Sequence, residues 1–154
     1  MLSRYTVRHF RHADMDRVLE IELASFGKDA WDRKLFAEYA LKCGDLFLLA
    51  SLGPKVDGYS IACIYKSRGA LAASLESIAV DPAARGKGAA SSLLKSTIRR
   101  LKLQGVGRFT LMVRRSNIVA QRFYQRHQFI PVRRAPGYYE DGEEGLLMRK
   151  TLAL

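Results

Sequence analysis

The chain has 154 residues, of which 48% are hydrophobic and 27% charged, and it carries a net charge of +11. This balance is ordinary for a folded protein and argues against disorder, and the length predicts one domain over 1–154. No apolar run approaches the roughly 18 residues that cross a bilayer, and the first residues lack a signal-peptide pattern, so we expect no membrane partner. The charge favours anionic partners such as nucleic acid, a phosphorylated cofactor or an acidic peptide, although a basic surface that only aids solubility fits it equally.

The first half of the chain is predicted to hold a strand, two helices and three further strands. Apolar residues at helical spacing predict the first helix, with Asp14 as its N-cap and with Leu19 and Leu23 widening its apolar face. Asp32 is expected to cap the second helix. The expected ranges are 5–10 (strand), 15–26 and 28–41 (helices), and 46–52, 59–66 and 73–80 (strands), with a turn at 53–58.

The second half is predicted to alternate between helix and strand and to end in two strands. Ser116 or Asn117 is expected to cap the second of its helices. The expected ranges are 88–103 and 118–126 (helices) and 109–113, 129–133 and 145–152 (strands). The whole pattern indicates a mixed α/β domain around one central sheet.

The two cysteines, Cys43 and Cys63, form no metal or redox motif. We expect two free, buried thiols in a reducing cytoplasm, and no metal site.

The stretch 77–94, SIAVDPAARGKGAASSLL, is the most informative part of the sequence, because a strand meets a helix there. A helix N-terminus presents unpaired N–H groups and the positive end of the helix dipole, which together bind a phosphate where side chains are small. Small and basic residues occupy this turn: Arg85, Gly86, Lys87, Gly88, Ala89 and Ala90. A plain turn in which glycine relieves strain is the alternative, but the spacing R-x-x-G-x-A directly after IAVDP favours a phosphate site.

On this motif the chain resembles the GNAT superfamily of acetyl-CoA-dependent N-acetyltransferases, and the resemblance covers nearly the whole length. It implies a single-domain α/β fold with a mixed, mostly antiparallel sheet of about seven strands flanked by about four helices. It also implies acetyl-CoA as co-substrate, with 85–90 holding the pyrophosphate. Backbone groups of Ile78, Ala79 and Val80 would bind the pantetheine arm.

Four stretches resemble, more narrowly, the ribosomal-protein-alanine and related protein N-terminal acetyltransferases. They are IELASFGKDAW (21–31), VRRSNIVAQRFYQRHQF (113–129), the tandem tyrosines at 138–139 and EDGEEGLLMRKTL (140–152). The resemblance implies acetylation of the N-terminal α-amine of a protein or peptide, such as a ribosomal protein.

Two other functions stay open: acetylation of a small-molecule amine, and a non-catalytic coenzyme A-binding module. The charge of +11 argues against cationic small substrates, which it would repel. No RNA motif or recognition helix stands out, so no sequence-specific nucleic acid is expected. A basic enzyme that visits the ribosome would still associate with RNA in a salt-sensitive way.

The family resemblance assigns reacting roles on the predicted helix 118–126 and the strand before the turn. Tyr124 matches the tyrosine that protonates the departing thiolate, and its alternative is a core aromatic. Asn117 matches an asparagine that contacts the cofactor arm, a role compatible with helix capping. The backbone N–H of Ile78 or a neighbour is the implied oxyanion donor.

The general base is where the sequence departs from the family. The ribosomal-protein enzymes have L-E-V-R on this strand, with glutamate as base, whereas here Met112 occupies that position and cannot take a proton. Glu76 is the candidate base, acting directly or through water from the same strand face as Ile78, or it is a substrate-contacting or solvated carboxylate. His127 is a weaker candidate, and the absence of any dedicated base is the third possibility.

The acceptor is expected to lie between aromatic residues. Tyr138 and Tyr139 match tandem tyrosines that grip the first residues of the substrate peptide, and their alternative is an exposed aromatic turn. Phe26 and Trp31 would form the opposite wall, or belong to the core. An α-amine, with a pKa of about 7.7–8.0, loses its proton near neutral pH far more easily than lysine at about 10.4, which suits a site with a weakened base.

Overall fold

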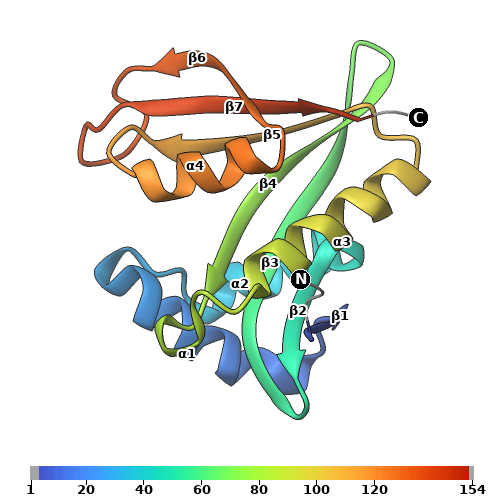
Figure 1. Cartoon of the computed structure of the whole chain (residues 1–154), viewed down its shortest axis with the longest axis vertical. Coiled ribbons are helices and arrows are strands. Elements are labelled where there is room, and N and C mark those ends of the chain that lie inside the picture. Colours follow the sequence, from blue (N-terminus) through green and yellow to red (C-terminus); the bar gives the residue numbers. More distant parts are fainter. Residues whose placement is uncertain (1–3, 153–154) are drawn as a thin grey trace.

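A computed structural model describes residues 4–152, which form one seven-stranded sheet (Figure 1). The strand order is β1-β2-β3-β4-β5-β7-β6, and only β4 and β5 run parallel. The strands are β1 (Thr6–His9), β2 (Phe47–Leu52), β3 (Lys55–Ser67), β4 (Ala70–Val80), β5 (Arg108–Arg114), β6 (Ile130–Ala135) and β7 (Gly145–Thr151), and the α-helices are α1 (Met15–Phe26), α2 (Arg33–Cys43), α3 (Ala89–Leu103) and α4 (Ile118–Arg126). The expected mixed, mostly antiparallel sheet with four helices is confirmed.

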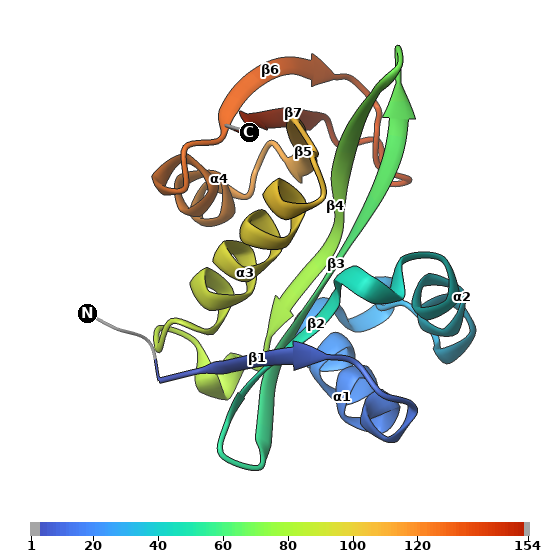
Figure 2. The same ribbon diagram turned by 90° about the vertical axis from the view of Figure 1, so that its right-hand side faces the viewer.

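The helices cover both faces of the sheet, with α1 and α2 on one side and α3 and α4 on the other (Figure 2). Each side has its own apolar core. The α1–α2 side buries Val18, Ile21, Phe36, Phe47, Tyr59 and Ile61, and the α3–α4 side buries Leu94, Leu101, Phe109, Leu111, Phe129 and Met148.

Strand β3 begins earlier than its sequence pattern indicates. The turn before β3 is confined to Gly53 and Pro54, and residues 55–58, expected in that turn, already belong to β3. Gly58 lies inside the strand, and only glycine fits there because a Cβ would come within 2.9 Å of the Ala79 carbonyl oxygen. The glycine therefore marks close backbone packing rather than a turn.

Two of the three predicted helix caps are confirmed. Asp32 accepts the Leu35 N–H at 2.9 Å, and Asn117, not Ser116, caps α4 by accepting the Ala120 N–H at 3.1 Å. Asp14 stands at the N-cap position of α1 as predicted, but its carboxylate does not cap the helix. It accepts from the Arg8 guanidinium at 2.8 and 2.9 Å and from the Arg11 N–H at 2.8 Å.

The apolar face of α1 is narrower than expected. Leu23 is 64% exposed, whereas Glu22, one position earlier on the helix, is 1% exposed. Glu22 shares the buried face of α1 with Val18 and Ile21, and Leu23 lies outside it.

The prediction of two free thiols is wrong. Cys43 ends α2 and Cys63 lies on β3, and the packing of α2 over β3 brings their Cα atoms to 5.3 Å, where they form a disulfide. The bond joins residues 20 apart in the chain, so neither spacing nor a motif indicated it. Because both cysteines are paired, they do not indicate a reducing compartment.

Within residues 4–152, no helix is both long and apolar enough to cross a membrane.

Candidate active site

Strands β4 and β5 part at the centre of the sheet (Figure 1). Their parallel pairing covers only 72–74 on β4 and 108–110 on β5. Beyond it, β4 stays paired with β3, while β5 stays paired with β7. The edge of β4 over 75–80 is therefore not paired with β5, and its outward N–H and C=O groups are available to an extended ligand that carries amides.

The predicted residues of the cofactor arm, Ile78, Ala79 and Val80, all lie on this open part of β4. Their other edge is paired with residues 58–60 of β3. On the open edge, the Val80 carbonyl already accepts a long 3.5 Å hydrogen bond from Ser25 Oγ. The other backbone groups on the open edge suit a chain laid along the strand.

The turn after β4 exposes the first N–H groups of α3. Gly86 and Gly88 have φ values of +82° and +98°, in the left-handed region that favours glycine. They turn the chain so that α3 begins at Ala89, and no side chain caps this helix, in contrast to α2 and α4.

The surroundings of this N-terminus fit an anionic diphosphate. No atom lies within 4 Å of the position that a Cβ on Gly86 would take, so the space beside the turn is open. Arg85 and Lys87 are exposed on either side of that glycine, while Ala89 is buried under the helix. The structure thus brings together bare N–H groups, two cations and room for a ligand, as a phosphate site requires.

Tyr124 lies in the α3–α4 core with its ring against Phe129 at 5.8 Å and against Phe123 at 5.3 Å. The residue is only 8% exposed, and no residue in 4–152 hydrogen-bonds its hydroxyl. Burial raises the pKa of Tyr124 well above its ordinary value, and the neighbouring Tyr139 raises it further. A phenol in this setting keeps its proton at neutral pH and can donate it.

Glu76 sits at a bulge of β4. Ile61 of β3 pairs with Ser77 while Ala62 pairs with Leu75, so Glu76 is the extra residue without a partner on β3. The expectation that Glu76 and Ile78 share a strand face is wrong, because the bulge breaks the alternation of side chains. Ile78 packs against the core on the α3 side.

The carboxylate of Glu76 lies instead on the α2 side of the sheet. It accepts a hydrogen bond from Ser74 Oγ at 2.7 Å. Burial raises the pKa of Tyr39 on α2, and the nearby charges of Glu76, Glu38 and Tyr138 raise it further. The Glu76 carboxylate on β4 and the Tyr138 hydroxyl in the β6–β7 loop thus lie within electrostatic range of Tyr39 on α2.

Tyr39 was not among the sequence-predicted site residues. An aromatic residue at helical spacing indicates an apolar helix face, but it does not show which other element packs against that face. Trp31, predicted as a substrate wall, stacks on the Tyr39 ring with centroids 4.9 Å apart, so the wall and the helix form one aromatic unit. Phe26, the other predicted wall residue, is 42% exposed at the end of α1.

Ion pairs hold the loop that carries the tandem tyrosines. Arg114 at the end of β5 contacts Asp141 and Glu143, each at 2.8 Å. The same guanidinium lies 4.1 Å from the centroid of the Tyr139 ring. Tyr138, which packs edge-on against that ring, is 56% exposed.

Met112 takes the place of a base and contacts the same loop. A Cβ added to Gly145 would lie 2.8 Å from the Met112 sulfur and 3.2 Å from Cβ of Tyr138. Glycine at 145 thus allows the methionine to pack beneath the tyrosine loop, in an apolar role.

A buried polar chain behind the site was missed from the sequence. Glu22 accepts the Trp31 N–H at 2.9 Å and a short hydrogen bond from the Tyr59 hydroxyl, which also contacts Ser77 Oγ at 2.7 Å. It links the loop after α1 to the residue next to the Glu76 bulge. The one sequence feature that points to this buried polar chain is a glutamate on the apolar face of the first helix.

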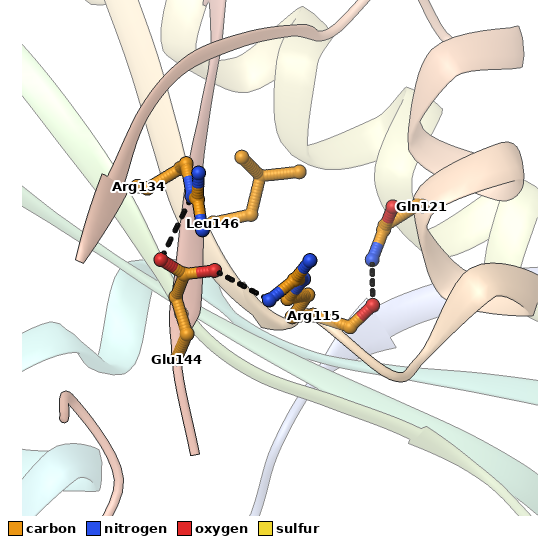
Figure 3. A pocket seen from close by; sticks show the side chains of 6 residues that line it. Arg115, Gln121, Arg134, Glu144 and Leu146 are labelled. Atoms are coloured by element: carbon orange, nitrogen blue, oxygen red, sulfur yellow. Dashed lines mark hydrogen bonds and ion pairs between the residues drawn. The ribbon is translucent and has the colours of Figure 1, made fainter. Parts of the chain in front are cut away.

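A cavity of about 300 Å³ lies between α4, β6 and β7 (Figure 3). Its charged residues satisfy one another, since Glu144 pairs with Arg134 at 2.8 Å and with Arg115 at 3.5 Å. None of the sequence-predicted site residues lines this cavity, so it is not part of the candidate active site.

Comparison with known proteins agrees with this geometry. Residues 15–129 match the Acetyltransferase (GNAT) family. An uncharacterized N-acetyltransferase of Methanocaldococcus jannaschii is 32% identical over 145 residues, which cover 94% of this chain and 90% of that protein. A putative ribosomal protein bS18-alanine N-acetyltransferase of Bacillus subtilis is 30% identical over 154 residues, with 99% of each chain covered. The crystal structure of Ard1 from Thermoplasma volcanium superposes with a TM-score of 0.89 at 22% identity, over 98% of this chain and 99% of that one.

Coenzyme A has been crystallised on other proteins of this fold. The chain therefore belongs to the GNAT acetyltransferase family and is an acetyl-CoA-dependent N-acetyltransferase.

Proposed function

We propose that the chain acetylates the N-terminal α-amine of a protein, and that a ribosomal protein is its substrate. The observation that carries the proposal is the placement of the Glu76 carboxylate on the α2 side of the sheet, opposite the α3 turn and within electrostatic range of Tyr39 and Tyr138. Aromatic side chains beside a carboxylate suit a peptide end that enters opposite the cofactor. The end-to-end relative named for ribosomal protein bS18 supports the same substrate class.

Acetyl-CoA supplies the activated acetyl group as a thioester. We assign its diphosphate to the N–H groups and cations of 85–90 and its amide-bearing arm to the open edge of β4 at 78–80. Asn117, which caps α4, keeps its side-chain N–H₂ available for the same arm. The backbone N–H of Ile78 or its neighbour is the proposed donor to the developing oxyanion.

Tyr124 is the proposed general acid. Its high pKa keeps the hydroxyl protonated until the thiolate leaves, and its position among aromatic rings excludes water.

Glu76 is the proposed proton acceptor, directly or through a water, since Met112, at the position of the expected base, cannot take a proton. His127 is a poorer candidate, because its Nε2 lies 3.1 Å from Ser91 Oγ on α3, on the other face of the sheet. An α-amine needs only weak assistance to lose its proton near pH 7, which fits an acceptor of this kind.

The tandem tyrosines and the Trp31–Tyr39 stack are the proposed walls of the acceptor slot, with Phe26 at its rim. Their hydroxyls can bond the peptide backbone while their rings limit the width of the first side chain. We propose the cytoplasm as the compartment, on the strength of the ribosomal substrate alone.

The proposal is tested by mass spectrometry of peptides incubated with the protein and acetyl-CoA. The panel contains free N-termini, the same peptides with a blocked N-terminus and one lysine, and a polyamine. We expect acetyl on α-amines only. Acetyl on lysine alone or on the polyamine alone would replace the proposed substrate class, and bound coenzyme A without any turnover would make the chain a non-catalytic module.

A further inference from the structure

The charge of the chain is distributed very unevenly. Residues 82–139 contain half of the 26 Lys and Arg and none of the 15 Asp and Glu. This segment runs from the turn before α3 to the β6–β7 loop, so one region of the fold carries cations with no acidic residue of its own.

Five cations gather beside one another on the α3–α4 side and form what we call the basic ridge: Lys95, Arg99, Lys102, Arg126 and Lys150. The first three follow one another at i, i+4 and i+7 and share a face of α3. Lys150 Nζ donates to the His127 carbonyl at 3.0 Å, directly after Arg126, and His127 Nε2 lies 3.1 Å from Ser91 Oγ, so β7 and the end of α4 meet α3 here. In keeping with this, Lys95, Arg126 and Lys150 lower the pKa of His127 after the larger effect of burial, and Lys102 lowers the pKa of Lys150 after burial. The five side chains thus come from α3, α4 and β7 to one place.

The charge of the ridge is not neutralised by the protein. None of its five members forms an ion pair with another residue of 4–152, and all except Lys150 are exposed. Some arginines elsewhere do form ion pairs, among them Arg17 with Asp81, Arg114 with Glu143 and Arg134 with Glu144. Clustered like charges oppose folding, so an unpaired group of this size suits an anion bound from outside.

The acetyl donor does not account for the ridge. Its diphosphate site is at Ala89, and Lys102 lies 13 residues further along α3, roughly 20 Å away at 1.5 Å per residue. The ridge occupies the second half of α3 and continues away from the cofactor turn.

We propose that the basic ridge binds the phosphate backbone of RNA without reading its sequence. Cations spread over about 10 Å of one helix face contact several phosphates of one strand at once. A membrane surface is a poorer fit, because a helix that lies on lipid inserts an apolar face, and α3 buries that face (Leu93, Leu94 and Leu101) in the core. The choice of RNA among polyanions rests on the proposed ribosomal substrate.

The test measures the affinity of the protein for a labelled, unstructured single-stranded RNA by fluorescence anisotropy. The titrations are repeated at salt concentrations from roughly 50 to 300 mM NaCl, over which the loss of affinity with salt reports the number of phosphate contacts. The ridge variant carries Lys95→Gln, Arg99→Gln, Lys102→Gln and Arg126→Gln. The matched control loses four exposed cations outside the ridge, by Lys34→Gln, Lys42→Gln, Lys66→Gln and Arg68→Gln.

We expect the ridge variant to lose at least about tenfold in affinity and to show a salt slope shallower by about 3, since each phosphate contact contributes about 0.7. The control should bind like the unaltered protein, and saturating coenzyme A should leave RNA bound. Equal binding by both variants, displacement of RNA by coenzyme A, or binding to anionic lipid vesicles in place of RNA would overturn the proposal. RNA binding is measured without turnover, and peptide acetylation by the ridge variant should be unchanged, so failure of either proposal is seen separately.

Discussion

Tyr124 keeps its proton at neutral pH because burial raises the pKa of its hydroxyl, and Tyr139 raises it further. Phenylalanine fits the same space, and the hydroxyl has no partner in the described chain whose loss would weaken the fold. We expect Tyr124→Phe to lower kcat by about 10²–10⁴, the usual contribution of a positioned acid, with coenzyme A affinity unchanged. Steady-state kinetics and calorimetric titration measure the two.

The matched control for this substitution is Tyr65→Phe, at a tyrosine 41% exposed on β3. It should leave kcat unchanged. If Tyr124→Phe also left kcat unchanged, Tyr124 would be a core aromatic and the proton would come from elsewhere.

Glu22 is a carboxylate buried on the apolar face of α1. Burial raises its pKa, while the hydrogen bonds from Trp31 and Tyr59 partly oppose that rise. Because the folded pKa lies above the unfolded one, the carboxyl favours the fold below its unfolded pKa of about 4.3, and this advantage is lost as pH rises to the folded value. Glu22→Gln, which cannot ionise, should therefore gain stability relative to the parent over that window.

Urea unfolding at a series of pH values tests this behaviour, with Glu20→Gln as control. Glu20 is on the same helix with a side chain 69% exposed. A stability difference between parent and Glu22→Gln that stays constant with pH would show that Glu22 does not titrate as its burial implies.

At the scale of elements, the turn between β4 and α3 depends on glycine conformation. Gly86 has φ of +82° and Gly105, at the other end of α3, has φ of +80°, and both have open space where a Cβ would lie. Gly86→Ala and Gly105→Ala should each cost about 1 kcal/mol of stability. Only Gly86→Ala should weaken coenzyme A binding, by at least about tenfold, because only that turn is proposed to hold the diphosphate.

Thermal unfolding and calorimetric titration of coenzyme A measure both effects. Equal affinity of the two variants for coenzyme A would place the diphosphate outside the turn.

The helices were predictable from the sequence to within a few residues, because helical spacing, caps and glycine stops agree. The residues of α1 were predicted without error, and Asp32 and Asn117 cap as expected. The glycine turn before α3 was predictable for the same reason, since its glycines are local, and its binding of the cofactor stays a prediction.

The acceptor side depended on facts that a single sequence does not contain. The bulge at Glu76 is a property of strand register, and it moved this carboxylate to a face that alternation does not predict. Tyr39 joined the site through packing of α2 over the sheet. The Asp14 side chain does not cap α1 because Arg8, on β1, binds its carboxylate.

At the scale of the whole molecule, the disulfide fastens the α1–α2 layer to the sheet. It closes a 20-residue separation between Cys43 and Cys63, so it should contribute about 3 kcal/mol by restricting the unfolded chain. Cys63→Ser, or a reducing agent added to the parent, should lower the free energy of unfolding by about this amount. Unfolding curves that coincide with and without reductant would show that the bond does not stabilise the fold.

The central claim is that the uncapped start of α3 and the open edge of β4 together hold the acetyl donor. A crystal structure with coenzyme A tests it most directly. We predict the diphosphate within hydrogen-bond distance of N–H groups in 86–91 and the amide-bearing arm paired with the backbone of 78–80. A diphosphate bound elsewhere, with these N–H groups occupied by the protein itself, would contradict the account.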